Sequence, residues 1–262
     1  MGGFAVASLP EQPQQRVTVA TDLLDKREVR IRRMFGEIAP WYDFLNHVLS
    51  LNIDKRWRTI TARRVPPVGD GPILDLCTGT GDLALTYHKA AGGTVPIIAA
   101  DFCHEMLVRA QQKFDKFGAT DRVTIVEADA QHLPFPHDYF QLVTNSFGLR
   151  NVTDPDQGLR EMVRVTRPGG RVAILEFSKP RNRFFGRMYM GYFRSVLPQI
   201  GQFFSRNDQS AYRYLPESVL KFPDGEAMLA KLRDRGLRNV TQFPLTFGIA
   251  TLYVGEKPGS PG

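Results

Sequence analysis

The chain of 262 residues has little cysteine, no long apolar run and no leader-like start. Its two cysteines, Cys77 and Cys103, are too few for a disulfide framework, and their spacing matches no zinc site. No run of about 18 apolar residues occurs, so no membrane-spanning helix is expected. The opening Met1–Gln15 lacks a basic segment followed by an apolar core, so it does not resemble a secretory signal. We therefore expect a cytoplasmic protein.

The chain also has fewer acidic than basic residues. Lys and Arg total 34 against 27 Asp and Glu, which gives a formal net charge of +7. An excess of this size is compatible with nucleic acid, an anionic membrane surface or an acidic ligand as partner, and it does not choose among them. Hydrophobic residues make up 42% of the chain, enough for a full core, and the length fits one α/β domain with additions.

The chain does contain an alternation of strand and helix patterns, which begins after the linker Pro66–Gly71. Strands are expected at 72–76, 94–100, 123–126, 140–144 and 171–177. Helices are expected at 82–90, 105–117, 155–166, 207–220 and 226–235, and a helical pattern broken by two turns covers 26–64. This alternation predicts parallel βαβ units. The last two strands, 240–243 and 249–254, are joined by a link too short for a helical crossover, which predicts an antiparallel hairpin.

The strongest local signal is Ile73–Leu83, in which a buried strand ends in a Gly-x-Gly turn that opens a helix. Glycine at Gly79 and Gly81 lets backbone amides approach a ligand closely. Asp101 ends the second strand, and a carboxylate about 20 residues after the turn suits the hydroxyls of a ribose. The alternative for Asp101 is a helix N-cap before Cys103.

Two further carboxylates, Asp75 and Asp82, flank this turn and bear on which cofactor it holds. Asp82 at the start of a helix would repel a pyrophosphate, whereas a cofactor with cationic groups would be attracted. S-adenosylmethionine carries an ammonium and a sulfonium, so it fits this turn better than NAD. The alternative for Asp75 is a carboxylate that caps loop amides.

Two loops follow strand ends, where open α/β sheets bind their ligands. In the first, Asp129 is expected to accept a hydrogen bond from an adenine amino group, and Ala130 to donate one from its backbone amide. Turn formation is the alternative for Asp129. The second loop, 144–153, is polar and contains glycine, and its position predicts contact with both the cofactor and the acceptor.

These motifs together resemble a known family. The segment Asp75–Leu83 is similar to motif I of class I S-adenosylmethionine-dependent methyltransferases. The wider resemblance is to the menaquinone/ubiquinone biosynthesis C-methyltransferase family, of the demethylmenaquinone methyltransferase type, and covers roughly Arg30–Lys257. It is carried by five further stretches: Trp41–Asn46, Ser146–Asp154, Arg167–Ser178, Tyr212–Ser218 and Phe222–Asp224.

The resemblance implies an α/β, Rossmann-like class I methyltransferase fold. Such a fold has a mostly parallel seven-stranded sheet, with an antiparallel C-terminal hairpin strand and helices on both faces. One methyltransferase domain is expected at 26–257, between tails at 1–25 and 258–262. Its expected parts are an N-terminal helical cap at 26–65, a cofactor-binding core at 72–178, a helical acceptor lid at 181–222, and a C-terminal helix and hairpin at 223–257.

The resemblance also implies which residues bind the cofactor. The contacts that it transfers to this chain are Thr80, Asp101, Asp129, Ala130 and Ser146. With the turn residues Asp75, Gly79 and Gly81, they form the expected S-adenosylmethionine site. The chain departs from the family at Cys77 and Thr78, where a small residue and glycine are common, and at Phe102 and Cys103 after the second strand. Neither departure removes a needed carboxylate.

The implied reaction moves a methyl group to a ring carbon of a polyprenylated quinol, demethylmenaquinol or the corresponding ubiquinone precursor. A quinol ring carbon becomes nucleophilic when a phenolic proton leaves, so a base or a held water must take that proton. We expect Arg150 and Asn151 to organise the acceptor oxygen, with Tyr42 and Tyr214 as wall or hydrogen-bonding groups. A structural ion pair is the alternative for Arg150, and ordinary packing for the tyrosines. No metal is expected, because the five histidines are scattered.

The segment Arg181–Arg206 mixes arginines with aromatic and methionine side chains. We expect a lid that receives the isoprenoid tail and contacts an anionic membrane surface, with an ordinary core helix as the alternative. The segment lacks the lysine runs of a nucleic-acid binder, so no nucleic-acid partner is expected. The remaining alternatives are a methyltransferase for another hydrophobic small molecule, an RNA-modifying module and a dehydrogenase. A homodimer is expected only from the general frequency of symmetric dimers.

Overall fold

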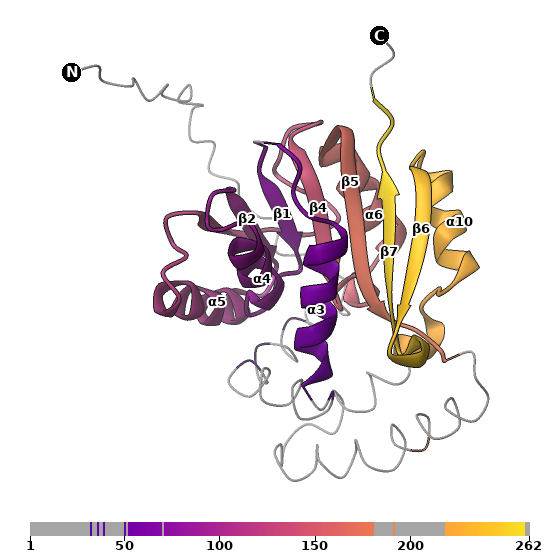
Figure 1. Cartoon of the computed structure of the whole chain (residues 1–262), viewed down its shortest axis with the longest axis horizontal. Coiled ribbons are helices and arrows are strands. Elements are labelled where there is room, and N and C mark those ends of the chain that lie inside the picture. The colour runs from indigo at the N-terminus through magenta and orange to yellow at the C-terminus, as the bar shows by residue number, and fades with distance from the viewer. Residues whose placement is uncertain are drawn as a thin grey trace, which may run out of the picture.

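The centre of the fold is a seven-stranded sheet with the strand order β3-β2-β1-β4-β5-β7-β6 (Figure 1). The computed structural model describes residues 52–69, 71–180 and 218–259, together with the single residues Arg32, Gly36, Ala39, Ser50 and Gly191. The strands are β1 (Ile73–Leu76), β2 (Ile97–Asp101), β3 (Val123–Glu127), β4 (Phe140–Ser146), β5 (Thr166–Phe177), β6 (Arg238–Leu245) and β7 (Ala250–Glu256). The first five strands pair in parallel, and β7 runs antiparallel to both β5 and β6. The predicted fold class and the C-terminal hairpin are confirmed.

Helices cover both faces of this sheet (Figure 1). On one face lie α3 (Ile53–Arg64), α4 (Asp82–Ala90) and α5 (His104–Lys116). On the other lie α6 (Pro155–Val165) and α10 (Glu226–Asp234). Two short 3-10 helices, η1 (Leu149–Asn151) and η2 (Thr246–Gly248), lie in the connections after β4 and β6.

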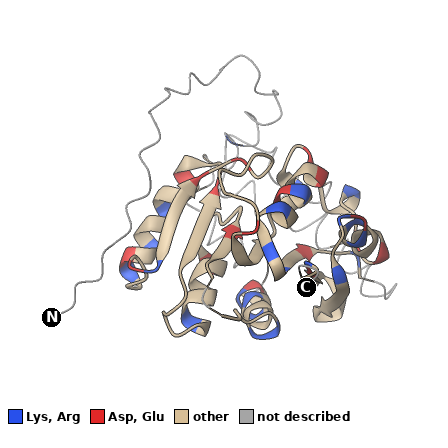
Figure 2. Ribbon diagram, turned by 90° about the horizontal axis from the view of Figure 1, so that it is seen from above, with Lys and Arg blue, Asp and Glu red and all other residues tan. Residues whose placement is uncertain are grey.

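Two hydrophobic cores result because successive side chains of a strand point to opposite faces. In β1, Ile73 packs into the core that α3, α4 and α5 cover, whereas Leu74 packs into the core that α6 and α10 cover. Both side chains are fully buried. Figure 2 shows the charged residues gathered on the helices and loops, with the central strands largely free of them.

The structure differs from the sequence prediction mainly at one strand. The strand predicted at 171–177 begins at Thr166, because Phe140 pairs with Thr166 before the register shifts and Leu142 pairs with Arg171. A Pro-Gly-Gly stretch lies at this irregularity. Proline and glycine are uncommon inside strands, so hydrophobic periodicity did not predict a strand there. The helix predicted at 207–220 lies outside the described residues except for its last three positions. None of the helices placed in the structure is long and apolar enough to cross a membrane.

The topology decides where the expected site residues lie. Parallel strands of a sheet all end at the same edge. Strands β1 to β5 therefore end together, at the lower edge of the sheet in Figure 1. The segments after β1, β2, β3 and β4 therefore lie side by side there, although 25 residues separate the end of β1 from the end of β2. The switch in strand order falls between β1 and β4, at the centre of this edge.

Candidate active site

The glycine turn after β1 is shaped by two glycines in left-handed backbone conformations. Gly79 has φ 57° and Gly81 has φ 84°. A Cβ added at Gly81 would lie 2.5 Å from the ring of Phe114, so only glycine lets the turn pack against α5. The left-handed glycines and this close packing against α5 set the path of the turn at the end of β1.

The buried carboxylate of Asp75 is hydrogen-bonded to the glycine turn, to α4 and to β4. Its Oδ2 accepts from the Thr78 hydroxyl at 2.6 Å and from the Ala84 amide at 3.1 Å, and its Oδ1 accepts from the Thr144 hydroxyl at 3.0 Å. The Ala84 amide belongs to the first turn of α4, whose N-cap residue, Gly81, has no side chain to satisfy it. Asp75 is 1% exposed, so both oxygens face protein donors and the structure favours the capping interpretation over direct contact with the cofactor.

Asp101 joins the end of β2 to the glycine turn. Its Oδ2 accepts from the Gly79 amide at 2.8 Å and its Oδ1 from the Cys103 amide at 2.9 Å. Burial raises the pKa of the Asp101 carboxyl from 3.8 to about 6, and these amides partly oppose the rise. Each carboxylate oxygen accepts more than one hydrogen bond, so the two amides leave capacity for hydroxyl donors.

The loop after β3 carries Asp129 and Ala130. Asp129 is about half exposed, and its carboxylate accepts from the backbone amide of Gln131 at 2.9 Å, as a turn-forming aspartate does. Ala130 is buried against the core below α6. The second carboxylate oxygen of Asp129 lies 3.3 Å from the imidazole of His132. Asp129 therefore forms the turn that was its alternative role in the sequence analysis.

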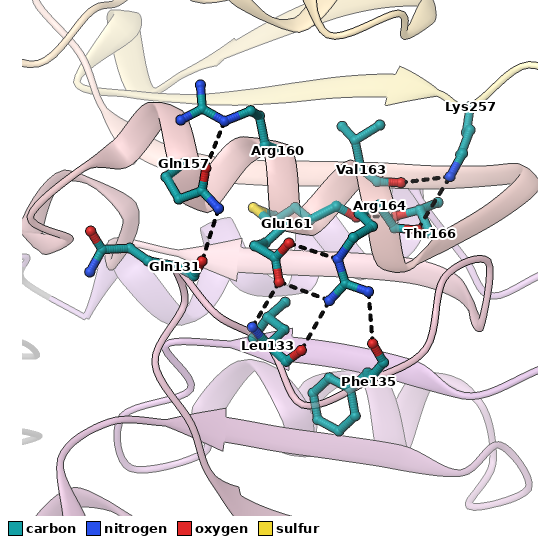
Figure 3. Close-up of polar contacts among 11 residues, drawn as sticks. Gln131, Leu133, Phe135, Gln157, Arg160, Glu161, Val163, Arg164, Thr166 and Lys257 are labelled. Carbon is teal, nitrogen blue, oxygen red and sulfur yellow. Dashed lines mark hydrogen bonds and ion pairs between the residues drawn. The ribbon is translucent and has the colours of Figure 1, made fainter. Parts of the chain in front are cut away.

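A polar network fixes this loop against α6 (Figure 3). Glu161 accepts from the backbone amide of Leu133 at 2.8 Å, and Arg164 donates to the carbonyls of Leu133 at 3.0 Å and Phe135 at 2.8 Å. The two side chains also pair with each other at 2.7 Å, which lowers the pKa of Glu161 and raises that of Arg164. Two side chains of one helix thus satisfy three backbone groups of the loop, so its path is set by α6.

The loop after β4 is anchored by Asn145. Its Nδ2 donates to the Leu76 carbonyl at 2.9 Å, and its Oδ1 accepts from the Leu149 amide at 3.0 Å, so one side chain joins β1 to η1. Phe147 adopts φ 59°, a left-handed conformation that is uncommon outside glycine and often occurs at functional sites. Ser146, the last residue of β4, lies beside this bend at the same edge as Gly79 and Asp101.

Arg150 and Asn151 follow in η1. The Nη1 of Arg150 donates to the Phe147 carbonyl at 2.6 Å and to both carboxylate oxygens of Glu176 at 2.9 Å. The side chains of Arg150 and Glu176 are 7% and 1% exposed, so this is a buried ion pair, the alternative that the sequence left open. Burial raises the pKa of Glu176, and the Arg150 guanidinium opposes that rise.

Two polar atoms beside this ion pair lack a hydrogen-bond partner among the residues that the structure describes. The Nε of Arg150 and the Oδ1 of Asn151 are buried and make no hydrogen bond within the described part of the chain. A buried donor and a buried acceptor left unpaired are costly, and native structures keep such groups mainly where a ligand or water completes them. The aromatic rings of Phe147 and Phe177 pack together nearby, with the Arg150 guanidinium 5.3 Å from the second ring.

The sequence analysis expected the carboxylate of Asp82 to attract a cationic group of the cofactor, but this carboxylate is paired within the protein. Its Oδ1 accepts from the Lys113 ammonium at 2.7 Å, and its Oδ2 lies 3.8 Å from the Arg58 guanidinium. Cations from two different helices therefore neutralise it, and neither was visible in the local sequence around the turn. The electrostatic argument for a cationic cofactor does not survive, and the cofactor has to be established from other evidence.

Other expected residues lie outside the described residues. These are Tyr42, Tyr214 and the segment 181–206, apart from Gly191. Conversely, the structure identifies polar groups at the site that were not predicted from the sequence: Asn145, Glu176, Arg58 and Lys113. Glu176 lies within a stretch that carried the family resemblance, so its position was a signal, whereas nothing near Lys113 in the sequence points to the glycine turn.

The fold is Rossmann-like, with its candidate site at the ends of the parallel strands. The chain superposes on the [4+2]-cyclase SpnF with a TM-score of 0.64 at 17% identity, covering 88% of this chain and 96% of that one. It also superposes on a SAM-dependent methyltransferase from Aquifex aeolicus with a TM-score of 0.56 at 18% identity, covering 76% and 88%. At this identity the likeness shows the fold alone.

The sequence comparison goes further: the chain belongs to the ubiE/COQ5 methyltransferase family, whose pattern matches residues 23–257. It is 46% identical over 234 residues to the ubiquinone/menaquinone biosynthesis C-methyltransferase UbiE of Geobacter sulfurreducens, covering 89% of this chain and 91% of that protein. It is 45% identical over 225 residues to the demethylmenaquinone methyltransferase of Thermus thermophilus, covering 86% and 100%. The chain is therefore an S-adenosylmethionine-dependent C-methyltransferase.

Proposed function

We propose that this protein methylates a ring carbon of a polyprenylated quinol, with demethylmenaquinol as the first candidate acceptor. The names of the relatives from Geobacter sulfurreducens and Thermus thermophilus support a quinone-pathway substrate. The observation that carries the proposal is the unpaired donor and acceptor at Arg150 Nε and Asn151 Oδ1. A phenolic hydroxyl both donates and accepts, so it complements this pair, and the adjacent rings offer an apolar wall to an aromatic acceptor.

The proposed chemistry needs little covalent work from the protein. When bound, S-adenosylmethionine would supply a methyl group made electrophilic by the sulfonium and would leave as the neutral thioether, and the methylated ring carbon would lose its hydrogen as a proton to water. The Nε of Arg150 donates a hydrogen bond to the oxygen of the acceptor as that oxygen loses its proton to water, because a charge-assisted hydrogen bond stabilises the phenolate even though Nη1 is paired with Glu176. Asn151 orients that hydroxyl. Alignment and exclusion of water provide most of the remaining acceleration.

We assign the cofactor to the edge formed by the ends of β1 to β4. Asp101 binds the ribose hydroxyls, the loop residues Asp129 and Ala130 bind the adenine, and Thr80 and Ser146 complete the site. The hydrogen-bond capacity left on the Asp101 carboxylate and the position of the glycine turn at the ends of the parallel strands support this assignment. The tyrosines expected near the acceptor, Tyr42 and Tyr214, remain predictions.

The affinity for S-adenosylmethionine is expected to fall as the pH drops through about 6. The pKa of Asp101 is raised to about 6 by burial, so above that pH the carboxylate accepts hydroxyl donors and below it a bound proton blocks one oxygen. In the acid limit the Kd should rise about tenfold per pH unit, as expected for a single linked proton. Isothermal titration between pH 5 and 7.5 measures this.

An Asp101→Asn variant is the matched control for the pH profile. It should bind S-adenosylmethionine weakly at pH 7.5 and show a flatter profile. Some pH dependence should remain, because burial also raises the pKa of Asp75 to about 6. A wild-type Kd that stays constant down to pH 5 would contradict the role of Asp101.

The reaction itself is tested with purified protein, S-adenosylmethionine and three acceptors: a demethylmenaquinol, a demethylated ubiquinol precursor and a sterol. The proposal expects transfer to a ring carbon of a quinol, seen as a mass increase of one methylene. Quinones extracted from cells lacking the protein should accumulate the unmethylated precursor, and its mass distinguishes naphthoquinol from benzoquinol. Transfer to the sterol alone, with an unchanged quinone extract, would sink the proposal.

We further propose peripheral contact with an anionic membrane, because a polyprenylated acceptor resides in lipid. The arginines and aromatic residues between Arg181 and Arg206 are the candidate carriers, and they lie in the part of the chain without a described structure. Vesicles containing anionic lipid should sediment the protein at low salt and release it at high salt. Absence of lipid-dependent sedimentation at either salt would exclude this contact. Sedimentation velocity would test the predicted homodimer.

A further inference from the structure

Lys113 reaches the glycine turn from a helix that otherwise packs against the sheet. Its Nζ donates to the Thr80 hydroxyl at 2.9 Å and to Asp82 Oδ1 at 2.7 Å. The next residue of α5, Phe114, packs its ring against Gly81. Two consecutive residues of α5 therefore contact three consecutive residues of the turn, which fixes the turn to this helix.

The direction of the hydrogen bond constrains Thr80. An ammonium has donors and no acceptor, so the Thr80 oxygen accepts from Lys113 and its own proton points elsewhere. Thr80 is 3% exposed, and its β-branched side chain has few rotamers available. Lys113 thereby selects the direction in which this buried hydroxyl donates.

The contact with Asp82 has a second effect. Asp82 begins α4, directly after the turn, and its side chain is 25% exposed. Lys113 is the nearer of the two cations found at Asp82, because the Arg58 guanidinium lies 3.8 Å from Asp82 Oδ2. Loss of the Lys113 contact would leave more of the Asp82 charge to repel the carboxylate of the methionine part of the cofactor.

We propose that Lys113 is a positioning residue for S-adenosylmethionine, which acts on the cofactor through the Thr80 hydroxyl and the Asp82 carboxylate. The proposal rests on the assignment of Thr80 to the cofactor site. It does not depend on which acceptor is methylated.

Lys116 provides a matched comparison on the same helix. It lies in the same last turn of α5, where a cation is favourable for the helix dipole, and its Nζ lies 5.9 Å from the ring centroid of Phe117. If Lys113 only stabilised α5, Lys113→Met and Lys116→Met would behave alike. A positioning role predicts different effects on cofactor binding with similar melting temperatures.

The experiment measures the Kd of S-adenosylmethionine by isothermal titration without any acceptor, together with melting curves. Lys113→Met is expected to raise the Kd about tenfold, the usual size of a lost charge-assisted hydrogen bond, and Lys116→Met less than about twofold. Lys113→Arg keeps a cationic donor and should recover part of the affinity. In turnover assays the KM for S-adenosylmethionine should rise while kcat at saturation changes little.

A double variant tests whether the effect passes through Thr80. In a Thr80→Val background, Lys113→Met should cost much less than it does in the wild type, because the hydroxyl that it orients is gone. Fully multiplicative effects of the two changes, or an unchanged Kd in Lys113→Met, would overturn the proposal. Lys113→Gln, which keeps a neutral donor, is measured alongside in case the methionine variant folds poorly. An unaltered Kd in Thr80→Val would instead refute the assignment of Thr80.

Discussion

A Glu176→Gln variant is expected to lose about 3–5 kcal/mol of its free energy of unfolding, the usual cost of leaving one member of a buried ion pair without its partner. The Arg150 guanidinium is 7% exposed and pairs with Glu176, whose two carboxylate oxygens each lie 2.9 Å from Nη1. Glutamine keeps the shape and one acceptor and removes the charge. Urea unfolding followed by circular dichroism measures the loss.

The double variant Arg150→Met with Glu176→Gln is the control. Removal of the unpaired charge should restore part of the stability, so the two single losses should add to more than the loss in the double variant. If the double variant is no more stable than Glu176→Gln alone, the pair does not act as a unit. That result would place the cost in packing around β5 instead.

Activity separates a structural from a catalytic role of Arg150. The double variant should fold and bind S-adenosylmethionine, because Arg150 has no expected contact with the cofactor. We expect its turnover with a quinol to fall at least 100-fold, as it does when a group that stabilises developing charge is removed. Near wild-type turnover with intact cofactor binding would exclude Arg150 from the methyl-transfer step.

A Gly148→Ala variant is expected to disrupt the site through a steric contact. A Cβ at Gly148 would lie 2.4 Å from the Cβ of Cys77 and 3.0 Å from the Nδ2 of Asn145. Because Cys77 opens the glycine turn, the clash pushes the turn and the β4 loop apart. We expect a loss of about 1–3 kcal/mol in unfolding free energy from overpacking. Displacement of both loops by about 1 Å should lower kcat/KM roughly 100-fold.

A second change should rescue this variant. Cys77→Gly removes the Cβ of Cys77, which is the atom closest to the added Cβ, and its Sγ, which would lie 3.2 Å away. Cys77 has φ 53°, a left-handed conformation that glycine adopts readily. Gly148→Ala with Cys77→Gly should therefore regain most of the activity. Gly259→Ala, where an added Cβ meets no atom within 4 Å, is the inert comparison. Failure of the rescue would show that Gly148 is required for a reason other than its distance from Cys77.

Much of the architecture was predictable from the sequence because it depends on local patterns. Helix α4 begins and ends where the periodicity predicted, at Asp82 and Ala90. The antiparallel hairpin of β6 and β7 followed from the length of its link alone. Strand β5 was predicted too short, because its first residues pair across a register shift that has no signature in hydrophobic spacing.

The site was harder to predict, since its electrostatics depend on contacts between distant residues. From the sequence, Asp75 and Asp82 were two carboxylates beside a glycine turn. In the fold, Asp75 caps α4, and Asp82 lies between Lys113 and Arg58. The sequence argument predicted S-adenosylmethionine, the cofactor of the family to which the chain belongs. It did so for a wrong reason, because Lys113 and Arg58 neutralise the Asp82 charge on which it relied.

By itself, the sequence determined the order of strands and helices along the chain, the glycine turn and the place of Asp101 at the end of β2, because each depends on residues close together in the chain. Only the tertiary structure decided which charges remain open to a ligand. Glu176 lies 26 residues from Arg150 and Lys113 lies 33 residues from Thr80. Parallel strand ends and packed helices bring these groups within hydrogen-bond distance, and the partner that each carboxylate finds there sets its role.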